Sequence, residues 1–215
     1  MKLMAAALTL WCLPSVGYGQ PGEAGIASAQ REILIVTPDA RDGRLEAARE
    51  AIGFWNDTLS ELGLPVHLHE SRVLTPADGV KPFENYTRQI WLLAGKPAPP
   101  ERQPPPPEAL TALGGDIVVF FSSQVIFSFA WPYEEPKRFF IGVQTDRSEP
   151  LTFPNVARNV IAHELGHTLG LAHNGNTPTL MCGPCQHTVY RSDEPRFFPL
   201  TPQDRERLRA LYSAP

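Results

Sequence analysis

The chain has 215 residues and a formal net charge of −4; 42% of its residues are hydrophobic and 20% are charged. This composition is that of a globular protein and excludes a wholly disordered chain. The acidic net charge argues against a nucleic-acid partner, which would need a basic binding face. The apolar runs are all shorter than the roughly 18 residues that span a bilayer, and the length favours a single domain.

The first 19 residues have the pattern of a secretory signal peptide. Lys2 precedes an apolar stretch at residues 3–13, and the small residues Gly17 and Gly19 form a cleavage site. We therefore expect residues 1–19 to be removed, which leaves a secreted or periplasmic protein with no membrane attachment. The alternative is that this stretch forms a short buried strand or helix.

The N-terminal half of the mature chain alternates between strand and helix patterns, after a short segment at residues 20–32. Runs of β-branched residues, or alternation of apolar and polar ones, predict strands, whereas apolar residues spaced by three and four predict amphipathic helices. These patterns predict a strand at 33–37, a helix at 45–62, a strand at 66–70 and a helix at 83–93.

Proline is the outlier in the composition, with 23 residues. Seven of the twelve residues at 96–107 are prolines, and this density predicts a polyproline-like excursion on the surface. We interpret residues 73–113 together as an insertion into one domain that spans residues 33–215.

The C-terminal half contains the strongest helix pattern. That helix begins at Pro154, because proline suits a first helical turn, and the last helix is predicted from Thr201 as its N-cap and Pro202 as its first residue. A continuous apolar run is typical of a strand buried on both faces. The predicted elements are a buried strand at 116–121, an apolar and aromatic segment without a clear period at 125–132, a strand at 138–145, a helix at 154–170 and the final helix.

One eleven-residue segment carries the residues that predict chemistry. His163 and His167 are four residues apart, so on a helix both rings leave the same face. Gly170 accepts a positive φ, so the chain can end the helix and turn back, which brings His173 towards the first two rings. Glu164 lies about 100° around the helix and can take a proton without being a ligand.

Three neutral imidazoles can bind one Zn²⁺ and leave its fourth tetrahedral position open for water, which is the pattern of catalytic rather than structural zinc. Zinc lowers the pKa of such a water towards ~7 and polarises a scissile carbonyl. The segment therefore predicts one catalytic zinc ion held by His163, His167 and His173, with Glu164 as general base. The alternative is a helix whose histidines are incidental.

The same segment, H-E-L-G-H-T-L-G-L-A-H, resembles the H-E-x-x-H-x-x-G-x-x-H signature of the metzincin metalloproteases. Met181, eight residues after His173, is similar to the methionine of the family's Met-turn, at a spacing like that of the matrixin branch. The resemblance covers residues 33–212. It implies an α+β, zincin-like fold: a mixed twisted sheet with an antiparallel edge strand, a long active-site helix, a Met-turn and a C-terminal helix.

The resemblance also implies a function. We expect a monomeric zinc metalloendopeptidase that hydrolyses peptide bonds in proteins or peptides. The strand at 138–145 would be the antiparallel edge that pairs with an extended substrate. The segment from Met181 towards Tyr190 would wall the pocket beyond the scissile bond.

Several features depart from the matrixin pattern. The ligands of a second, structural zinc are not evident between residues 122 and 145, and calcium loops rich in glycine and aspartate are missing. No cysteine-containing latency segment precedes the domain, so we expect no inhibition by a matrixin-type propeptide. Gly183 stands two residues after Met181, so a tyrosine ligand is not expected there. We therefore describe the chain as matrixin-like and name no narrower subfamily.

Cys182 and Cys185 remain if Cys12 leaves with the signal peptide. An even number of cysteines in an oxidising compartment predicts one disulfide. Two alternatives stay open: a thioredoxin-type redox pair, and a zinc site that includes His187.

Two further alternatives concern binding rather than hydrolysis. His67 and His69 alternate on one predicted strand and are interpreted as facing solvent rather than a metal. The whole chain could instead be a catalytically silent metzincin-fold domain that binds protein through its edge strand and the aromatic loop at 127–131. The intact Glu164 argues against this second alternative, because a binding domain has no evident need for a base.

Overall fold

The computed structural model describes five stretches of the chain, which are residues 30–77, 79–93, 102–134, 138–183 and 196–213. The predicted signal peptide, Cys185 and part of the proline-rich run lie outside them. Among the helices in these stretches, none combines the length and the apolarity that crossing a bilayer requires.

Within the described residues, five strands form one mixed sheet in the order β2-β1-β3-β5-β4. The strands are β1 (Gln30–Val36), β2 (His67–Leu74), β3 (Ile117–Phe121), β4 (Phe129–Pro132) and β5 (Phe139–Val143). Only β4 is antiparallel, and it pairs with β5 at one edge of the sheet. The predicted α+β fold with a mixed sheet and an antiparallel edge strand is confirmed.

The helices are α1 (Arg44–Glu61), α2 (Lys81–Leu92), α3 (Glu108–Thr111), α4 (Pro154–Thr168) and α5 (Pro202–Tyr212). Local signals set the starts of the last two long helices. Pro154 stands in the first turn of α4, and Thr201 and Asp204 form a reciprocal capping box at α5. The long helix at 154–168 and the C-terminal helix therefore lie where the sequence predicted them.

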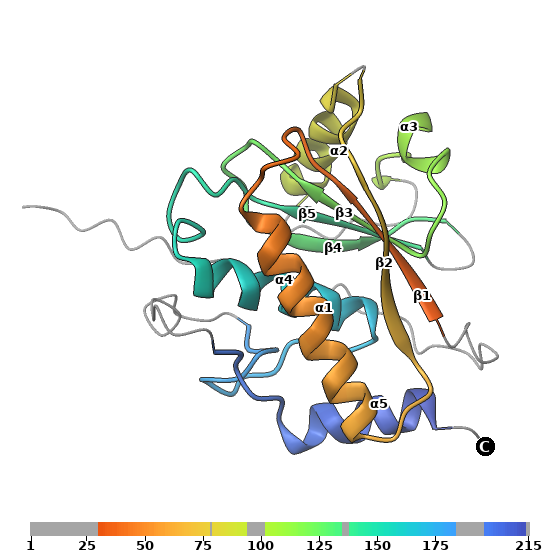
Figure 1. The fold of residues 1–215 in the computed structure, drawn as a ribbon, viewed down its shortest axis with the longest axis vertical. Coiled ribbons are helices and arrows are strands. Elements are labelled where there is room, and N and C mark those ends of the chain that lie inside the picture. The colour runs from red at the N-terminus through yellow and green to blue at the C-terminus, as the bar shows by residue number, and fades with distance from the viewer. Residues whose placement is uncertain (1–29, 78, 94–101, 135–137, 184–195, 214–215) are drawn as a thin grey trace, which may run out of the picture.

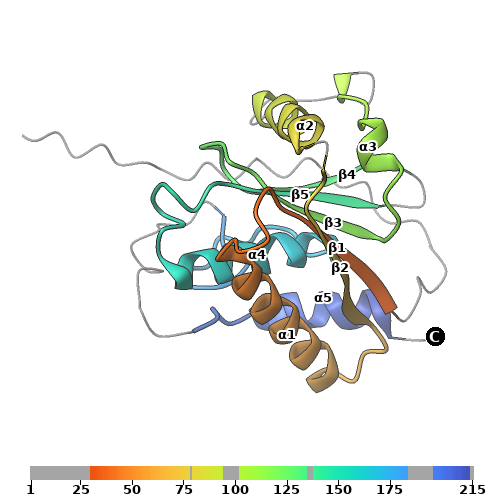
Figure 2. The ribbon, with the colours of Figure 1, turned by 45° about the horizontal axis from the view of Figure 1, so that its top comes forward.

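Helices cover both faces of the sheet (Figure 1). Helices α1, α4 and α5 lie on one side, and α2 and α3 lie on the other (Figure 2). Strand β1 contributes to both cores: Ile33 and Ile35 pack with the first group of helices, and Leu34 and Val36 with the second. The stretch interpreted as an insertion thus supplies a second helical layer as well as a proline-rich run.

The prediction that the strand at 138–145 forms the edge of the sheet is wrong. This strand is β5, which lies between β3 and β4 and is buried at all five positions. A continuous apolar run is the signal of such a central strand. The edge strand is β4, where Pro132 is tolerated because an edge position leaves one side of the strand without ladder hydrogen bonds.

Glu84 of α2 joins the outer helical layer to the loop between β3 and β4. Its carboxylate accepts hydrogen bonds from Ser122 Oγ (2.5 Å), from the N–H and Oγ of Ser123 (2.6 and 2.7 Å) and from Gln124 Nε2 (2.5 Å). Burial raises the pKa of the Glu84 carboxyl, but these hydrogen bonds outweigh burial and hold the pKa below its ordinary value of 4.5. Helix α2 is thus fastened to the segment that leads into the edge strand.

Replacing this carboxylate should destabilise the fold in a pH-dependent way. Glu84→Gln should lower the free energy of unfolding in urea at pH 7 by about 2 kcal/mol, because hydrogen bonds to a charged acceptor are lost. The pKa is lower in the folded than in the unfolded chain, so the ionised form stabilises the fold at neutral pH. That contribution is lost as the pH falls through the lowered pKa, so parent and variant should converge in acid.

The matched control is Glu206→Gln on the exposed face of α5. It removes the same charge and should change stability by less than about 0.5 kcal/mol. Equal stability of parent and Glu84→Gln at pH 7 would refute the fastening role of Glu84.

Candidate metal centre

Helix α4 ends in a turn that brings the chain back across its own last residues. Gly170 has a φ of +89°. Its N–H donates to His167 O (3.0 Å), and the N–H of Leu171 donates to Gly166 O (3.1 Å). These two bonds form a Schellman motif, which glycine favours because it has no Cβ to clash at positive φ. The reversal brings His173 next to the two histidines of the helix.

The three predicted ligands meet at one point. The Nε2 atoms of His163, His167 and His173 form a triangle with sides of 3.0, 3.1 and 3.1 Å. Among the described residues, this is the only group of three or more His, Cys, Asp or Glu side chains close enough to hold a metal ion. Nitrogens of a tetrahedral zinc site with bonds of about 2.0–2.1 Å lie about 3.3 Å apart, so the spacing suits such a cation.

Two main-chain carbonyls orient the rings. His163 Nδ1 lies 2.7 Å from Leu180 O, and His167 Nδ1 lies 2.8 Å from Leu171 O. A carbonyl oxygen only accepts, so in each neutral ring Nδ1 carries the proton and Nε2 keeps its lone pair. Two such lone pairs cannot hydrogen-bond to each other, and a cation between them would remove their repulsion. The donor set therefore suits a metal ion.

The protonation state of the rings also suits metal binding. Burial, together with the charge of His173, lowers the pKa of His163 to about 4. Burial also lowers the pKa of His167 well below its ordinary value of 6.5, with smaller contributions from His163 and His173. Both rings are consequently neutral at pH 7, which is the form that binds a metal ion.

Glu164 lies beside the histidines but outside their group. Its side chain is buried, with 6% of the residue exposed. Burial raises the pKa of its carboxyl to about 8, against the hydrogen bond that it accepts from the backbone N–H of Ala130 in β4. The carboxyl therefore sits between α4 and the edge strand, and a raised pKa suits a group that takes up and returns a proton near neutral pH.

Met181 is fully buried and packs against α4 at Gly166. A Cβ at Gly166 would lie 2.6 Å from Met181 Sδ and 3.0 Å from Trp55 Cζ2, so only glycine leaves room for both side chains. The turn is also tied by its main chain, because Leu180 N–H donates to Pro199 O (3.0 Å). The predicted Met-turn residue thus lies against the helix turn that carries His167.

Gly183 leaves room for the third histidine. A Cβ at this position would lie 2.6 Å from Cγ and 3.0 Å from Nδ1 of His173. Nothing in the sequence analysis singled out this contact, nor the carbonyls of Leu171 and Leu180 or the N–H of Ala130. Backbone groups carry no residue-type signal, so sequence reasoning had no means of finding them.

The remaining predicted residues lie apart from this group or outside the described residues. Cys182 is buried, and its Sγ lies 3.2 Å from Thr177 Oγ1. The disulfide stays a prediction because Cys185 is outside the described residues, as are His187 and Tyr190. His67 and His69 are exposed on β2, as predicted.

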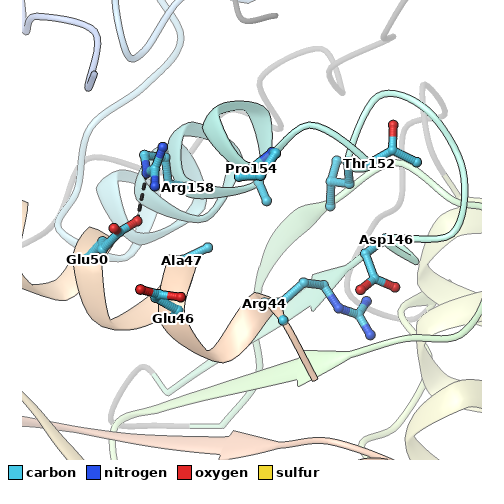
Figure 3. A pocket seen from close by; sticks show the side chains of 11 residues that line it. Arg44, Glu46, Ala47, Glu50, Asp146, Thr152, Pro154 and Arg158 are labelled. Carbon is cyan, nitrogen blue, oxygen red and sulfur yellow. Dashed lines mark hydrogen bonds and ion pairs between the residues drawn. The ribbon is translucent and has the colours of Figure 1, made fainter. Parts of the chain in front are cut away.

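A separate pocket of about 190 Å³ lies between the N-terminal turns of α1 and α4 and the loop at 146–152 (Figure 3). None of the three histidines lines it. Arg158 at its wall pairs with Glu50 at 2.7 Å, and Arg44 pairs with Asp42 at 2.6 Å. Its arginines are therefore engaged in structural ion pairs, and the pocket is not part of the metal centre.

Comparison with known proteins agrees with this geometry. Residues 132–213 match the family model for matrixin. Over 73 residues the chain is 34% identical to matrix metalloproteinase-26 of Homo sapiens, in an alignment that takes in 33% of this chain and 26% of that protein. The chain thus spans about a quarter of the length of this curated relative.

Two solved structures are more distant. Archaemetzincin of Methanopyrus kandleri is 15% identical with a TM-score of 0.48, over 86% of this chain and 96% of that one. A chain of a chaperone–substrate complex is 17% identical with a TM-score of 0.43, over 72% of this chain and 28% of that one.

The mixed sheet, the histidine-bearing helix with its returning turn, and the family match define a metzincin-like protein. Its C-terminal part, residues 132–213, is matrixin-like. This part contains β5, α4, the Met-turn and α5, so the match falls on the elements that build the metal centre. The predicted resemblance is confirmed.

Replacing each of two helix glycines by alanine should change the free energy of unfolding in opposite directions. Gly53→Ala in α1 meets nothing within 4 Å and should stabilise the fold by about 0.5–1 kcal/mol, because alanine is the better helix former. Gly166→Ala in α4 must displace Met181 or Trp55 and should destabilise it by about 1–2 kcal/mol. Urea unfolding of both variants measures the difference, and a gain in stability by Gly166→Ala would contradict the packing described.

Gly183→Ala should weaken zinc binding, because the added methyl displaces the ring of His173. We expect a loss of about tenfold or more in affinity, measured by competition with a chromophoric chelator. Gly175→Ala in the same turn is the matched control, since its Cβ meets nothing within 4 Å. Equal affinities of the two variants would show that the ring does not depend on Gly183.

Proposed function

We propose that this chain is a zinc-dependent metalloendopeptidase. The observation that carries the proposal is the convergence of three Nε2 atoms within 3.1 Å of one another, two of them on rings whose Nδ1 faces a carbonyl. His163, His167 and His173 would hold one zinc ion. When bound, zinc would polarise the scissile carbonyl and acidify a water molecule.

The proton transfers of the reaction are assigned to a residue of the chain. Glu164 acts as general base towards the attacking water and then returns the proton to the leaving amine. Its hydrogen bond to the N–H of Ala130 holds the carboxyl beside the edge strand. Burial keeps the carboxyl out of bulk solvent, so the proton is exchanged with the reacting groups.

Strand β4 is the place for an extended substrate. It is the antiparallel edge of the sheet, and it contains Ala130, the contact of Glu164. A peptide that added a further strand there would be fixed by main-chain hydrogen bonds next to the general base. We therefore propose protein or peptide substrates, and we transfer the predicted substrate-pairing role from the strand at 138–145 to β4.

The proposal also covers where the protein is found and its covalent and oligomeric state. A signal peptide at residues 1–19, a secreted or periplasmic mature chain, a monomeric state and a disulfide between Cys182 and Cys185 complete it. These features rest on the sequence patterns given above.

Glu164→Gln should keep zinc and lose hydrolysis. The amide fills the same space but cannot take up a proton, so we expect turnover to fall by about 10²–10⁴-fold. The measurement is digestion of a mixed peptide library by the mature protein, with and without a chelator, alongside zinc content by elemental analysis.

His167→Ala is the contrasting variant, because it should lose zinc and hydrolysis together. Full turnover by Glu164→Gln would overturn the assignment of the base. A parent chain that holds zinc but cleaves no peptide would instead support the silent binding domain.

A further inference from the structure

Asn174 follows His173 directly. Its main chain joins the turn that ends α4 and carries His173 (the histidine turn, residues 169–174) to the turn that carries Met181 (the Met-turn, residues 179–183). Its N–H donates to Met181 O (2.8 Å), and its carbonyl accepts from Gly183 N–H (3.0 Å). The two segments run side by side at this point, in a short parallel bridge. Both the N–H and the carbonyl of the residue that follows His173 are therefore hydrogen-bonded to the Met-turn.

The side chain of Asn174 adds contacts in two directions. Its Oδ1 accepts from the N–H of Asn176 (3.0 Å) and from Thr179 Oγ1 (2.9 Å), within the same turn. Its Nδ2 points the other way and donates to Asp204 Oδ2 (3.0 Å) at the start of α5. One amide thus connects the histidine turn to a helix 30 residues further along the chain.

Asp204 is a rigid anchor for this amide. It is buried, with 7% exposed, and belongs to the capping box of α5. The same Oδ2 accepts from Thr201 N–H (2.9 Å), while Asp204 N–H donates to Thr201 Oγ1 (3.0 Å). A carboxylate at a helix N-terminus is also favoured by the helix dipole, so its position is fixed independently of Asn174.

Only an amide satisfies both ends of this bridge. The carboxylate of Asp204 requires a donor, whereas the N–H of Asn176 requires an acceptor. Asparagine offers one of each on a short side chain, and aspartate would offer two acceptors. The residue type at 174 is therefore matched to its neighbours.

We propose that Asn174 is a positioning residue for His173, and that it holds the third ring in place by linking the turn to α5 through Asp204. The inference rests on the proposed function, because the role it assigns to Asn174 is in metal binding. Asn174 contacts no reacting atom and acts by fixing the backbone beside a ligand. Partners that orient metal ligands typically change affinity by about 10–100-fold when they are replaced.

The test is Asn174→Asp, measured by zinc affinity in chelator competition and by thermal melting of the zinc-free protein. The variant keeps the acceptor for Asn176 and Thr179 but turns a second oxygen towards Asp204 Oδ2, where two carboxylates would repel. We expect zinc affinity to fall by about 10–100-fold, with a smaller change in the melting of the zinc-free chain.

Asp204→Asn provides the rescue. Added to Asn174→Asp, it removes the repulsion between the two carboxylates. Because the same Oδ2 also accepts from Thr201 N–H, we expect a partial recovery, with zinc affinity about fivefold or more above that of Asn174→Asp. Asn176→Asp is the matched control, because it places the same charge two residues away on an exposed side chain, and it should bind zinc like the parent. If Asn174→Asp does not fold, Asn174→Ala replaces it, since alanine has no donor to Asp204.

The outcomes separate the two proposals. A parent chain that binds no zinc would overturn the proposed function and this inference with it. A parent that binds zinc, with Asn174→Asp or its alanine replacement binding equally well, would overturn the inference alone. A loss of affinity that Asp204→Asn does not reduce at all would also overturn it, because the link through α5 would then be absent.

Discussion

The mutual repulsion of unprotonated imidazole nitrogens is the constraint that the C-terminal half of this chain meets. Two rings turn their protonated Nδ1 towards carbonyls and present Nε2 lone pairs to each other at 3.1 Å, with the third ring as close. The lone pairs of His163 and His167 repel each other without a cation, so the surrounding main chain must hold these two rings in place. The carbonyls come from different places, Leu171 in the helix-ending turn and Leu180 in the Met-turn. The orientation of the rings therefore depends on the two turns being held in register.

The rest of the domain supports the helix that carries this group. Trp55 of α1 is fully buried and donates from Nε1 to Ala162 O (2.8 Å), one residue before His163. At the C-terminal end of α4, Arg31 of β1 donates to Thr168 O (3.0 Å) and Tyr212 of α5 donates to Leu169 O (3.2 Å). A cation and a hydroxyl thus satisfy carbonyls that the helix end leaves open. These contacts come from both halves of the chain, so the helix is fixed by elements far apart in sequence.

The parts of the structure that sequence reasoning found are those with a local signal. The spacing of His163 and His167 and the glycine at 170 predicted the helix, its end and the meeting of three rings. The edge strand was misplaced because β4 is only four residues long and shows no period, whereas β5 shows the continuous apolar run of a central strand. The role of α2 as a second layer was not predicted, since its amphipathic pattern does not state which face of a sheet it covers. The contact between Asn174 and Asp204 joins segments that are distant in sequence, and no residue spacing in the sequence predicts that they meet.

The residues of the candidate metal centre also lie close together in the sequence. Its histidines, its methionine turn and the helix start that anchors them all fall between residues 163 and 204, inside the stretch that matches the matrixin family. The loops that close to form it are short, and the entropy of closing them does not depend on the length of chain upstream. Lengthening the N-terminal half therefore adds little to the entropic cost of bringing the three histidines together. Helix α2 lies upstream of the three histidines and packs on the opposite face of the sheet, so this second layer does not cover the face that carries them.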